Sequence, residues 1–273
     1  MMVAGHETTA NALHFMLLYL AAHPAAQRSL VRDLDDIIGS KSPENWDYDT
    51  MLLPLLNSHA GACMNEVLRM MPSVTMIPKI VTPDAPQSLT LDGTTHVVPA
   101  GTQILISAFS AACNPKFWPT QPSRVTGQPH DMDDFLPEEE QGIEEVKDDI
   151  IDNKALGMYR PVPGSYFPFG EGARSCLGRR IAQVKMMATL AVIFQHCSIE
   201  LAVDEWATDI QIDMMDQEAR RSVYKQAQDK FEDTMTQCIS IITLKLHGAY
   251  VPIRFVERGN ERFVNFLADE EKE

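Results

Sequence analysis

The run from 169 to 178 constrains the fold of this chain more than any other segment. It has the sequence FGEGARSCLG and leads into an apolar, periodic stretch that predicts a helix beginning at Cys176. Glycine has no Cβ atom, so Gly170, Gly172 and Gly178 leave room for something flat and bulky against the backbone. A cysteine in the first turn of a helix is stabilised as a thiolate by the exposed backbone N–H groups and the positive end of the helix dipole. The segment therefore predicts a ligand site built around this cysteine.

Two neighbouring side chains fit the same hypothesis. Phe169 is placed to cover the sulfur and keep water away, and Arg174, two residues before Cys176, is placed to meet an acidic group of the same ligand. The alternative is an ordinary glycine-rich turn beside a buried structural cysteine. The full ten-residue pattern favours the ligand site over that alternative.

Composition limits the classes of protein to which the chain can belong. Its 38 acidic residues against 23 basic ones give a net charge of -15, which argues against nucleic acid as a partner, because such binding depends on Lys and Arg neutralising phosphates. Eleven Asp and Glu with one Lys lie between 131 and 152, and we expect a solvated, mobile loop there rather than an acidic docking tail. The five cysteines contain no C-x-x-C pair, which disfavours a disulfide framework and a zinc site.

Neither a secretory signal nor a membrane span is predicted. No basic start precedes an apolar run with a small-residue cleavage site, and no uncharged apolar window reaches the length of a bilayer crossing. The apolar piece from 10 to 22 contains Asn11 and His14, so we expect a buried helix. Its helical pattern begins without an N-cap, so we also expect a truncated chain.

Hydrophobic periodicity predicts a mainly α chain with small antiparallel β-sheets. The expected helices are 1–22, 25–38, 52–71, 176–196 and 214–231. Short β-rich runs between tight turns predict a small antiparallel sheet within 75–107. We expect a strand at 198–203 and a closing hairpin made of 239–246 and 251–256. The segment 114–167 has little periodicity and predicts a long meander.

Three motifs in order carry a resemblance to a known family. Residues 169–178 resemble the haem-binding signature F-x-x-G-x-R-x-C-x-G of the cytochrome P-450 superfamily. Upstream, AGHETT at 4–9 resembles its oxygen-activating helix motif, and Glu66-x-x-Arg69 resembles its ion-paired helix. An E-x-x-R pattern alone is a common surface pair, but three patterns in order are specific. The sequences of 164–206 and 241–263 most resemble those of fungal, microsomal-type members. The resemblance implies the C-terminal half of a cytochrome P-450 fold, with 1–273 as a partial domain.

The resemblance assigns haem as the cofactor. Cys176 would be the axial thiolate of the haem iron. The other residues implied to bind the cofactor are Gly5, Phe169, Gly170, Gly172, Arg174 and Gly178.

The resemblance also implies tasks for the polar residues upstream. Gly5 would open the helix at the oxygen pocket, Thr8 would hydrogen-bond dioxygen or its water, and Glu7 would help relay protons. Glu66 and Arg69 would brace the haem loop as a buried ion pair rather than touch substrate.

The implied activity is insertion of one oxygen atom of dioxygen into a small organic, lipophilic substrate. Electrons would come from NADPH through a cytochrome reductase, which Arg179, Arg180 and Lys185 would attract, unless they are ordinary solvated helix charges. The family type implies the cytoplasmic face of the endoplasmic reticulum membrane for the longer parent protein, with no anchor in this chain. One alternative is a non-catalytic fragment with an incomplete haem pocket. Another is a haem-thiolate isomerase or dehydratase, against which Glu7 and Thr8 argue.

The sequence departs from the family pattern at two places that bear on haem retention. Glu139 stands where an Arg usually completes a network with Glu66 and Arg69, and Arg124 or Arg160 is a possible substitute. Ala112 and Cys113 replace a common His-Arg pair before Asn-Pro. Lys79 is expected either to reach a haem propionate or to lie exposed at a strand edge.

Overall fold

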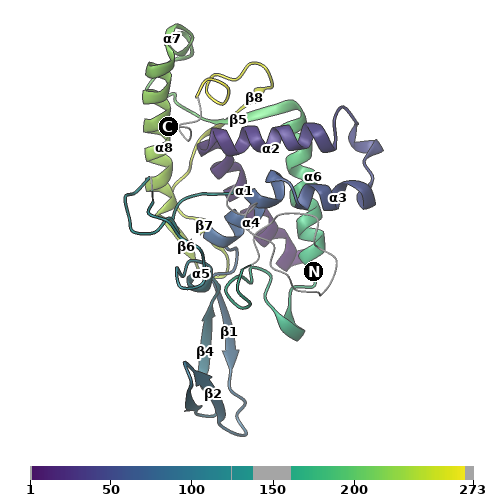
Figure 1. Ribbon diagram of the computed structural model, residues 1–273, viewed down its shortest axis with the longest axis vertical. Coiled ribbons are helices and arrows are strands. Elements are labelled where there is room, and N and C mark those ends of the chain that lie inside the picture. Colours follow the sequence, from purple (N-terminus) through teal and green to yellow (C-terminus); the bar gives the residue numbers. More distant parts are fainter. Residues whose placement is uncertain (1, 124, 138–160, 268–273) are drawn as a thin grey trace.

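The computed structural model describes residues 2–123, 125–137 and 161–267 of the 273-residue chain. A helical body carries a β arm that projects from one end (Figure 1). The α-helices are α1 (Met2–Ala22), α2 (Pro24–Ile37), α3 (Tyr48–Leu56), α4 (His59–Met70), α5 (Ala108–Ala112), α6 (Arg179–His196), α7 (Asp209–Met214) and α8 (Gln217–Met235). The strands are β1 (Met76–Ile80), β2 (Gln87–Leu91), β3 (Thr94–Val98), β4 (Gln103–Ser107), β5 (Cys197–Leu201), β6 (Cys238–Ser240), β7 (Leu244–Leu246) and β8 (Ile253–Glu257). The mainly α class with small antiparallel sheets is therefore confirmed.

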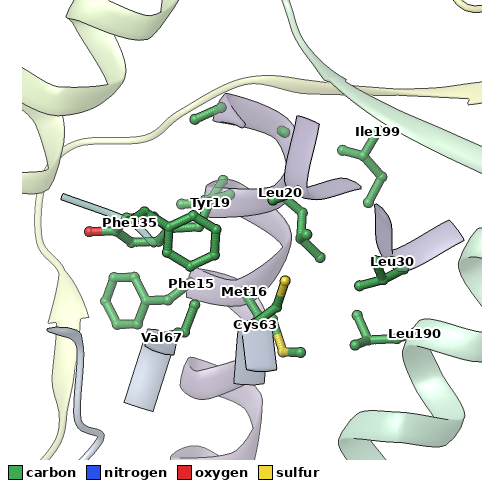
Figure 2. Packing of buried hydrophobic residues seen from close by; sticks show 14 of the residues in the cluster. Phe15, Met16, Tyr19, Leu20, Leu30, Cys63, Val67, Phe135, Leu190 and Ile199 are labelled. Atoms are coloured by element: carbon green, nitrogen blue, oxygen red, sulfur yellow. The ribbon is translucent and has the colours of Figure 1, made fainter. Parts of the chain in front are cut away.

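Helix α1 forms the centre of the body. Its last two turns are almost entirely buried, and Phe15, Leu20 and Ala21 are fully buried. It contacts α2, α4, α6 and β5, and Figure 2 shows side chains from these elements meeting around it. The expected helix over 10–22 is present and mostly buried, while Ala10 and His14 are exposed.

The corner between α1 and α2 is tied to β5 by one buried amide. Pro24 starts α2, where its missing N–H costs nothing. Gln27 donates to the carbonyls of Leu20 (2.9 Å) and Ile199 (2.7 Å) and accepts from the Ile199 N–H at 2.9 Å. Because all three bonds are buried, they fix the register of β5 against the helical core.

The single helix expected over 52–71 is wrong, because the chain breaks between α3 and α4. Asp47 caps the start of α3 by accepting from the Thr50 N–H, and Ser58 caps α4 by accepting from the Ala60 N–H at 3.1 Å. A Cβ built at Gly61 would lie 2.0 Å from the Leu56 carbonyl oxygen, so the two helices meet closer than any other residue would allow. The apolar period continues across the break and hides it in the sequence.

The small antiparallel sheet expected in the 75–107 region exists as two ribbons. β1 pairs with β4 and β2 with β3, and together they form the projecting arm of Figure 1. The closing hairpin is wrong: β6 pairs with β7, and β8 pairs with β5. Closeness in the sequence favours pairing of β8 with β7. Instead β8 pairs with β5, which is distant in the sequence and is buried against the core.

The remaining expected elements shift only at their ends. The predicted helices 25–38 and 214–231 correspond to α2 and α8, and the predicted strand 198–203 corresponds to β5. None of the helices in the described part of the chain has both the length and the hydropathy that crossing a bilayer requires.

The start of the acidic segment is not the solvated loop that we expected. Asp131 and Asp134 are each only 7% exposed. Asp131 accepts from the Gln121 N–H (3.2 Å), Asp134 accepts from the Ser123 hydroxyl (2.9 Å), and burial raises the pKa of Asp134. Backbone and hydroxyl donors thus draw two carboxylates inward. Residues 138–152 of the segment lie outside the described residues.

Candidate functional site

The cysteine loop is a tight turn that leaves its thiol at the surface. Cys176 is a free, exposed cysteine, and its N–H donates to the Phe169 carbonyl at 2.8 Å, which closes the loop. Gly170 (φ +67°) and Gly172 (φ +69°) have left-handed backbone conformations that residues with a Cβ rarely adopt. The glycines are therefore required by the turn itself, whatever lies against it.

Helix α6 begins three residues later than predicted. Its first residue is Arg179 and its N-cap is Gly178, while Cys176 lies in the preceding turn, where its carbonyl accepts from the Arg179 N–H at 3.3 Å. A Cβ at Gly178 would lie 3.7 Å from the Cys176 sulfur. The cysteine thus lies just in front of the helix N-terminus rather than within its first turn, and Gly178 keeps side-chain atoms away from the sulfur.

Two cations flank this loop in different ways. The Arg179 guanidinium lies 5.6 Å from the centroid of the Phe169 ring, whose other contacts are with the hydrophobic core. Arg174 ends a short 3₁₀ turn (Gly172–Arg174) and is exposed. Phe169 is therefore held at the base of the loop, and Arg174 is available to an acidic ligand group.

The first turns of α1 carry the second set of predicted residues. Gly5 and Glu7 are exposed, Thr8 is half-buried, and no atom lies within 4 Å of a Cβ built at Gly5. Glu7 accepts a hydrogen bond at 2.7 Å from the hydroxyl of Thr243. Sequence reasoning missed this contact, because its partners are 236 positions apart and no local pattern marks Thr243.

Glu66 and Arg69 form a closed ion pair inside α4. Arg69 donates through Nε to Glu66 Oε2 and through Nη2 to Glu66 Oε1, both at 2.7 Å, and both side chains are buried. Arg69 also donates to the carbonyls of Met132 (2.9 Å) and Asp134 (3.3 Å). Glu66 accepts from the Leu136 N–H at 3.2 Å. The pair therefore holds the main chain of the 132–136 meander against α4.

A second link joins α4 to the segment that precedes the cysteine loop. The Tyr166 hydroxyl donates to the Asn65 carbonyl at 3.1 Å. The Glu66–Arg69 pair thus contacts the meander, and the neighbouring Asn65 contacts the chain that leads to the cysteine loop. The bracing of that loop by Glu66 and Arg69 stays a prediction.

The two candidate regions belong to one packed unit. Helices α1 and α6 are in contact, and Figure 1 shows that they begin toward the same end of the molecule. Across 2–123, 125–137 and 161–267, no group of three or more His, Cys, Asp or Glu side chains could hold a metal ion by itself. The exposed Cys176 thiol is accessible to a metal whose remaining ligands come from a bound cofactor.

Comparison with known proteins decides the family. The family model described as Cytochrome P450 matches residues 1–225 of this chain. The chain belongs to the cytochrome P450 family. The match includes the three P450 motifs described above, from the first turns of α1 to the cysteine loop.

Relatives of this P450 chain come from distant organisms. It is 29% identical over 197 residues to Cytochrome P450 3A13 of Mus musculus, which covers 72% of this chain and 32% of the relative. It is 30% identical over 203 residues to Cytochrome P450 4c3 of Drosophila melanogaster, covering 74% of this chain and 32% of the relative. A Cytochrome P450 monooxygenase of Arthrobotrys oligospora is 28% identical over 214 residues, covering 76% and 35%. The chain thus spans about a third of the length of these relatives, and their similar identities do not single out the fungal one.

The departures from the P450 pattern are only partly visible. Glu139, Arg124 and Arg160 lie outside the described residues. Cys113 lies 3.8 Å from Arg69 Nη1, and burial raises the pKa of its thiol. Lys79 is exposed on β1, which favours the strand-edge alternative over contact with a cofactor.

Proposed function

We propose that this chain forms the haem-binding and oxygen-activating part of a monooxygenase. The overall reaction is RH + O₂ + NADPH + H⁺ → ROH + H₂O + NADP⁺, where RH is a lipophilic organic substrate. The observation that carries the proposal is the exposed Cys176 thiol at the end of a glycine turn, just before α6, within the ten-residue signature of the family. We treat 1–273 as a partial P450 domain.

The residues of the loop fit a haem group. Cys176 would supply the thiolate ligand, and Gly170, Gly172 and Gly178 would leave the backbone open to the face of the macrocycle. Arg174, which is exposed, would pair with a propionate. When bound, a thiolate-ligated haem supplies the activation of dioxygen and the cleavage of its O–O bond.

Glu7 and Thr8 would deliver protons. Glu7 is exposed, so its carboxyl group can exchange protons with water. Thr8 follows it on the same helical turn and is half-buried, which suits a hydroxyl that passes a proton inward. Gly5 lies one turn earlier and keeps this face of α1 clear, because it has no side chain.

Glu66 and Arg69 would act on the site through the backbone that they hold. Neither side chain would touch substrate, because both are buried in contacts with the 132–136 meander. Their role would be to keep the meander and α4 rigid behind the cysteine loop.

A reductase and a membrane would belong to the complete protein. Arg179, Arg180 and Lys185 are exposed near the start of α6, and we propose that they attract an acidic NADPH-dependent reductase. Lys185→Glu should then raise the reductase concentration needed for half-maximal reduction, most strongly at low salt. We place the complete protein at the cytoplasmic face of the endoplasmic reticulum membrane.

The test is the optical spectrum of the haem-supplied chain after reduction and exposure to carbon monoxide. A strongly red-shifted Soret band is expected for wild type and for Cys197→Ala, whose cysteine lies at the far end of α6. Cys176→Ala should lose that band.

Other outcomes would favour the alternatives. No haem uptake, or a band indifferent to Cys176, would favour a fragment without a functional haem pocket. A Cys176-dependent band in a protein that converts substrate without consuming dioxygen would favour an isomerase or dehydratase.

A further inference from the structure

The Glu7 carboxylate is held by a residue from the opposite end of the chain. Thr243 lies in the turn between β6 and β7, and its hydroxyl donates to Glu7 Oε1 at 2.7 Å. The same hydroxyl oxygen accepts from the Asn11 side-chain amide at 3.2 Å. Glu7 and Asn11 are four residues apart on α1, so one face of the helix presents both partners to Thr243.

The direction of these bonds is settled by the donors available. A threonine hydroxyl has one proton, and an amide N–H cannot accept, so Asn11 must donate to Thr243. The hydroxyl proton of Thr243 is therefore left to point at the carboxylate. A valine at this position would keep the shape of the side chain and lose both bonds.

Thr243 is itself fixed in place by the turn around it. Its side chain is buried although its neighbours Ile241 (81%) and Ile242 (80%) are exposed. The next N–H, of Leu244, donates to the Ser73 carbonyl at 2.9 Å, and the Ser73 hydroxyl donates to the Thr8 carbonyl at 2.9 Å. The turn is thus tied to the two residues that we assign to proton delivery.

We propose that Thr243 is a positioning residue for proton delivery, which holds the Glu7 carboxylate in one orientation and connects it to the β6–β7 turn. The inference rests on the proposed function of Glu7. Without the hydroxyl, the exposed carboxylate would adopt several rotamers, and the proton path would be formed only part of the time.

The first test measures the contact without any cofactor. Urea unfolding of the 273-residue chain is compared for wild type, Thr243→Val, Glu7→Ala and the double variant. Glu7→Ala is used here rather than Glu7→Gln, because glutamine keeps an oxygen that can still accept from Thr243. We expect the midpoint shift of the Thr243→Val, Glu7→Ala double variant to be smaller than the sum of the two single shifts, and Thr243→Ser to resemble wild type. Additive shifts would overturn the proposal.

The second test measures the role in the haem-loaded protein, supplied with a reductase and NADPH. Thr243→Val should raise the hydrogen peroxide released per NADPH consumed by about 3-fold or more, and Thr243→Ser should restore the wild-type ratio. The control is Thr236→Val, because the exposed Thr236 hydroxyl donates to the Asp233 carbonyl at 2.7 Å, at the end of α8. A wild-type ratio in Thr243→Val, with a raised ratio in Glu7→Gln, would overturn the role of Thr243.

Failure of the proposed function has a different signature. It would appear as the absence of a Cys176-dependent Soret band, whereas the urea experiment reports on Thr243 and Glu7 in the chain itself.

Discussion

The guanidinium of Arg69 donates two parallel hydrogen bonds of 2.7 Å to the carboxylate of Glu66, and less than a tenth of either side chain is exposed. The outer sides of the same pair bind backbone groups of the 132–136 meander. Replacing Arg69 by Leu should lower the free energy of unfolding by about 3–5 kcal/mol, because it leaves a buried carboxylate without its cation. Urea denaturation measures this change.

A matched control for that experiment lies on α8. Lys225 and Asp229 form an exposed pair at 3.1 Å, so Lys225→Leu should change stability by about 0.5 kcal/mol or less. Equal losses in the two variants would contradict the bracing role of Arg69.

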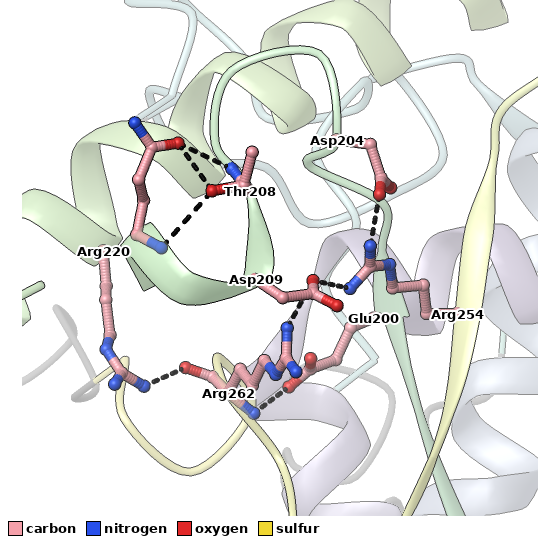
Figure 3. A network of polar contacts seen from close by, with 8 residues as sticks. Glu200, Asp204, Thr208, Asp209, Arg220, Arg254 and Arg262 are labelled. Carbon is pink, nitrogen blue, oxygen red and sulfur yellow. Dashed lines mark hydrogen bonds and ion pairs between the residues drawn. The ribbon is translucent and has the colours of Figure 1, made fainter. Parts of the chain in front are cut away.

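A second prediction concerns Glu200, whose carboxylate holds the C-terminal segment. Glu200 Oε1 accepts from the N–H groups of Arg262 (2.9 Å), Phe263 (2.7 Å) and Val264 (3.0 Å), and Figure 3 shows Glu200 beside Arg262. Burial raises the pKa of this carboxyl group. Glu200→Ala should cost about 3 kcal/mol and speed hydrogen exchange at these amides, because they lose a buried acceptor.

Two comparisons sharpen the Glu200 experiment. Glu200→Gln keeps an acceptor oxygen and should lose less stability. Glu205→Ala removes only an exposed ion pair with Lys230 and should leave the exchange rates unchanged. Protected amides in Glu200→Ala would show that other contacts hold the segment.

A third prediction compares two helical glycines. A Cβ at Gly61 would lie 2.0 Å from the Leu56 carbonyl oxygen, whereas a Cβ at Gly5 would meet no atom within 4 Å. Gly61→Ala should therefore destabilise the protein by about 1–3 kcal/mol through forced separation of α3 and α4. Gly5→Ala should add up to about 1 kcal/mol of stability, because alanine favours a helix.

The glycine pair also separates packing from cofactor binding. Thermal unfolding of both variants measures stability, and titration of haem-loaded Gly5→Ala with a ligand of the haem iron measures the oxygen pocket. If Gly5 keeps space for the oxygen pocket, its variant should be more stable and bind ligands of the haem iron less tightly. A stable Gly61→Ala protein would instead show that α3 can shift.

A fourth prediction concerns His23, which stacks on Tyr19 and lies 4.8 Å from the Phe135 ring centroid. Burial lowers its pKa from 6.5 to about 4. In the unfolded chain His23 therefore becomes protonated near pH 6.5, whereas in the folded protein it becomes protonated only near pH 4. Stability contributed by neutral His23 is fully present above pH 6.5 and is lost as the pH falls toward 4.

The free energy of unfolding should fall by about 2 kcal/mol over this pH range. This is less than the full pKa shift implies, because His23 is only half-buried and its ring keeps some contact with water. Urea midpoints of wild type and His23→Gln, measured from pH 4 to 7, isolate the contribution of the histidine from that of other groups. Parallel pH profiles would show that His23 does not control acid stability.

The predictable parts of the fold are those governed by local chemistry. Helices α2, α6 and α8 follow from apolar periodicity, helped by Pro24 at the start of α2 and by Gly178 before α6. The cysteine loop follows from a signature that Phe169, Gly172, Arg174, Cys176 and Gly178 all match. The break after Leu56 was not predicted, because the apolar period runs across it without interruption. A single serine, Ser58, which caps α4, is a weaker sequence signal than that period.

By itself, the sequence determined the helical class, the order of the three family motifs and the residue types that each motif offers to a cofactor. These depend on neighbours within a few positions, where periodicity and backbone conformation act directly. Only the tertiary structure decided that β8 pairs with β5, that Arg69 binds the 132–136 backbone and that Thr243 holds Glu7. Such contacts join residues tens to hundreds of positions apart, and they form because the packed chain brings polar groups to partners that satisfy their hydrogen bonds.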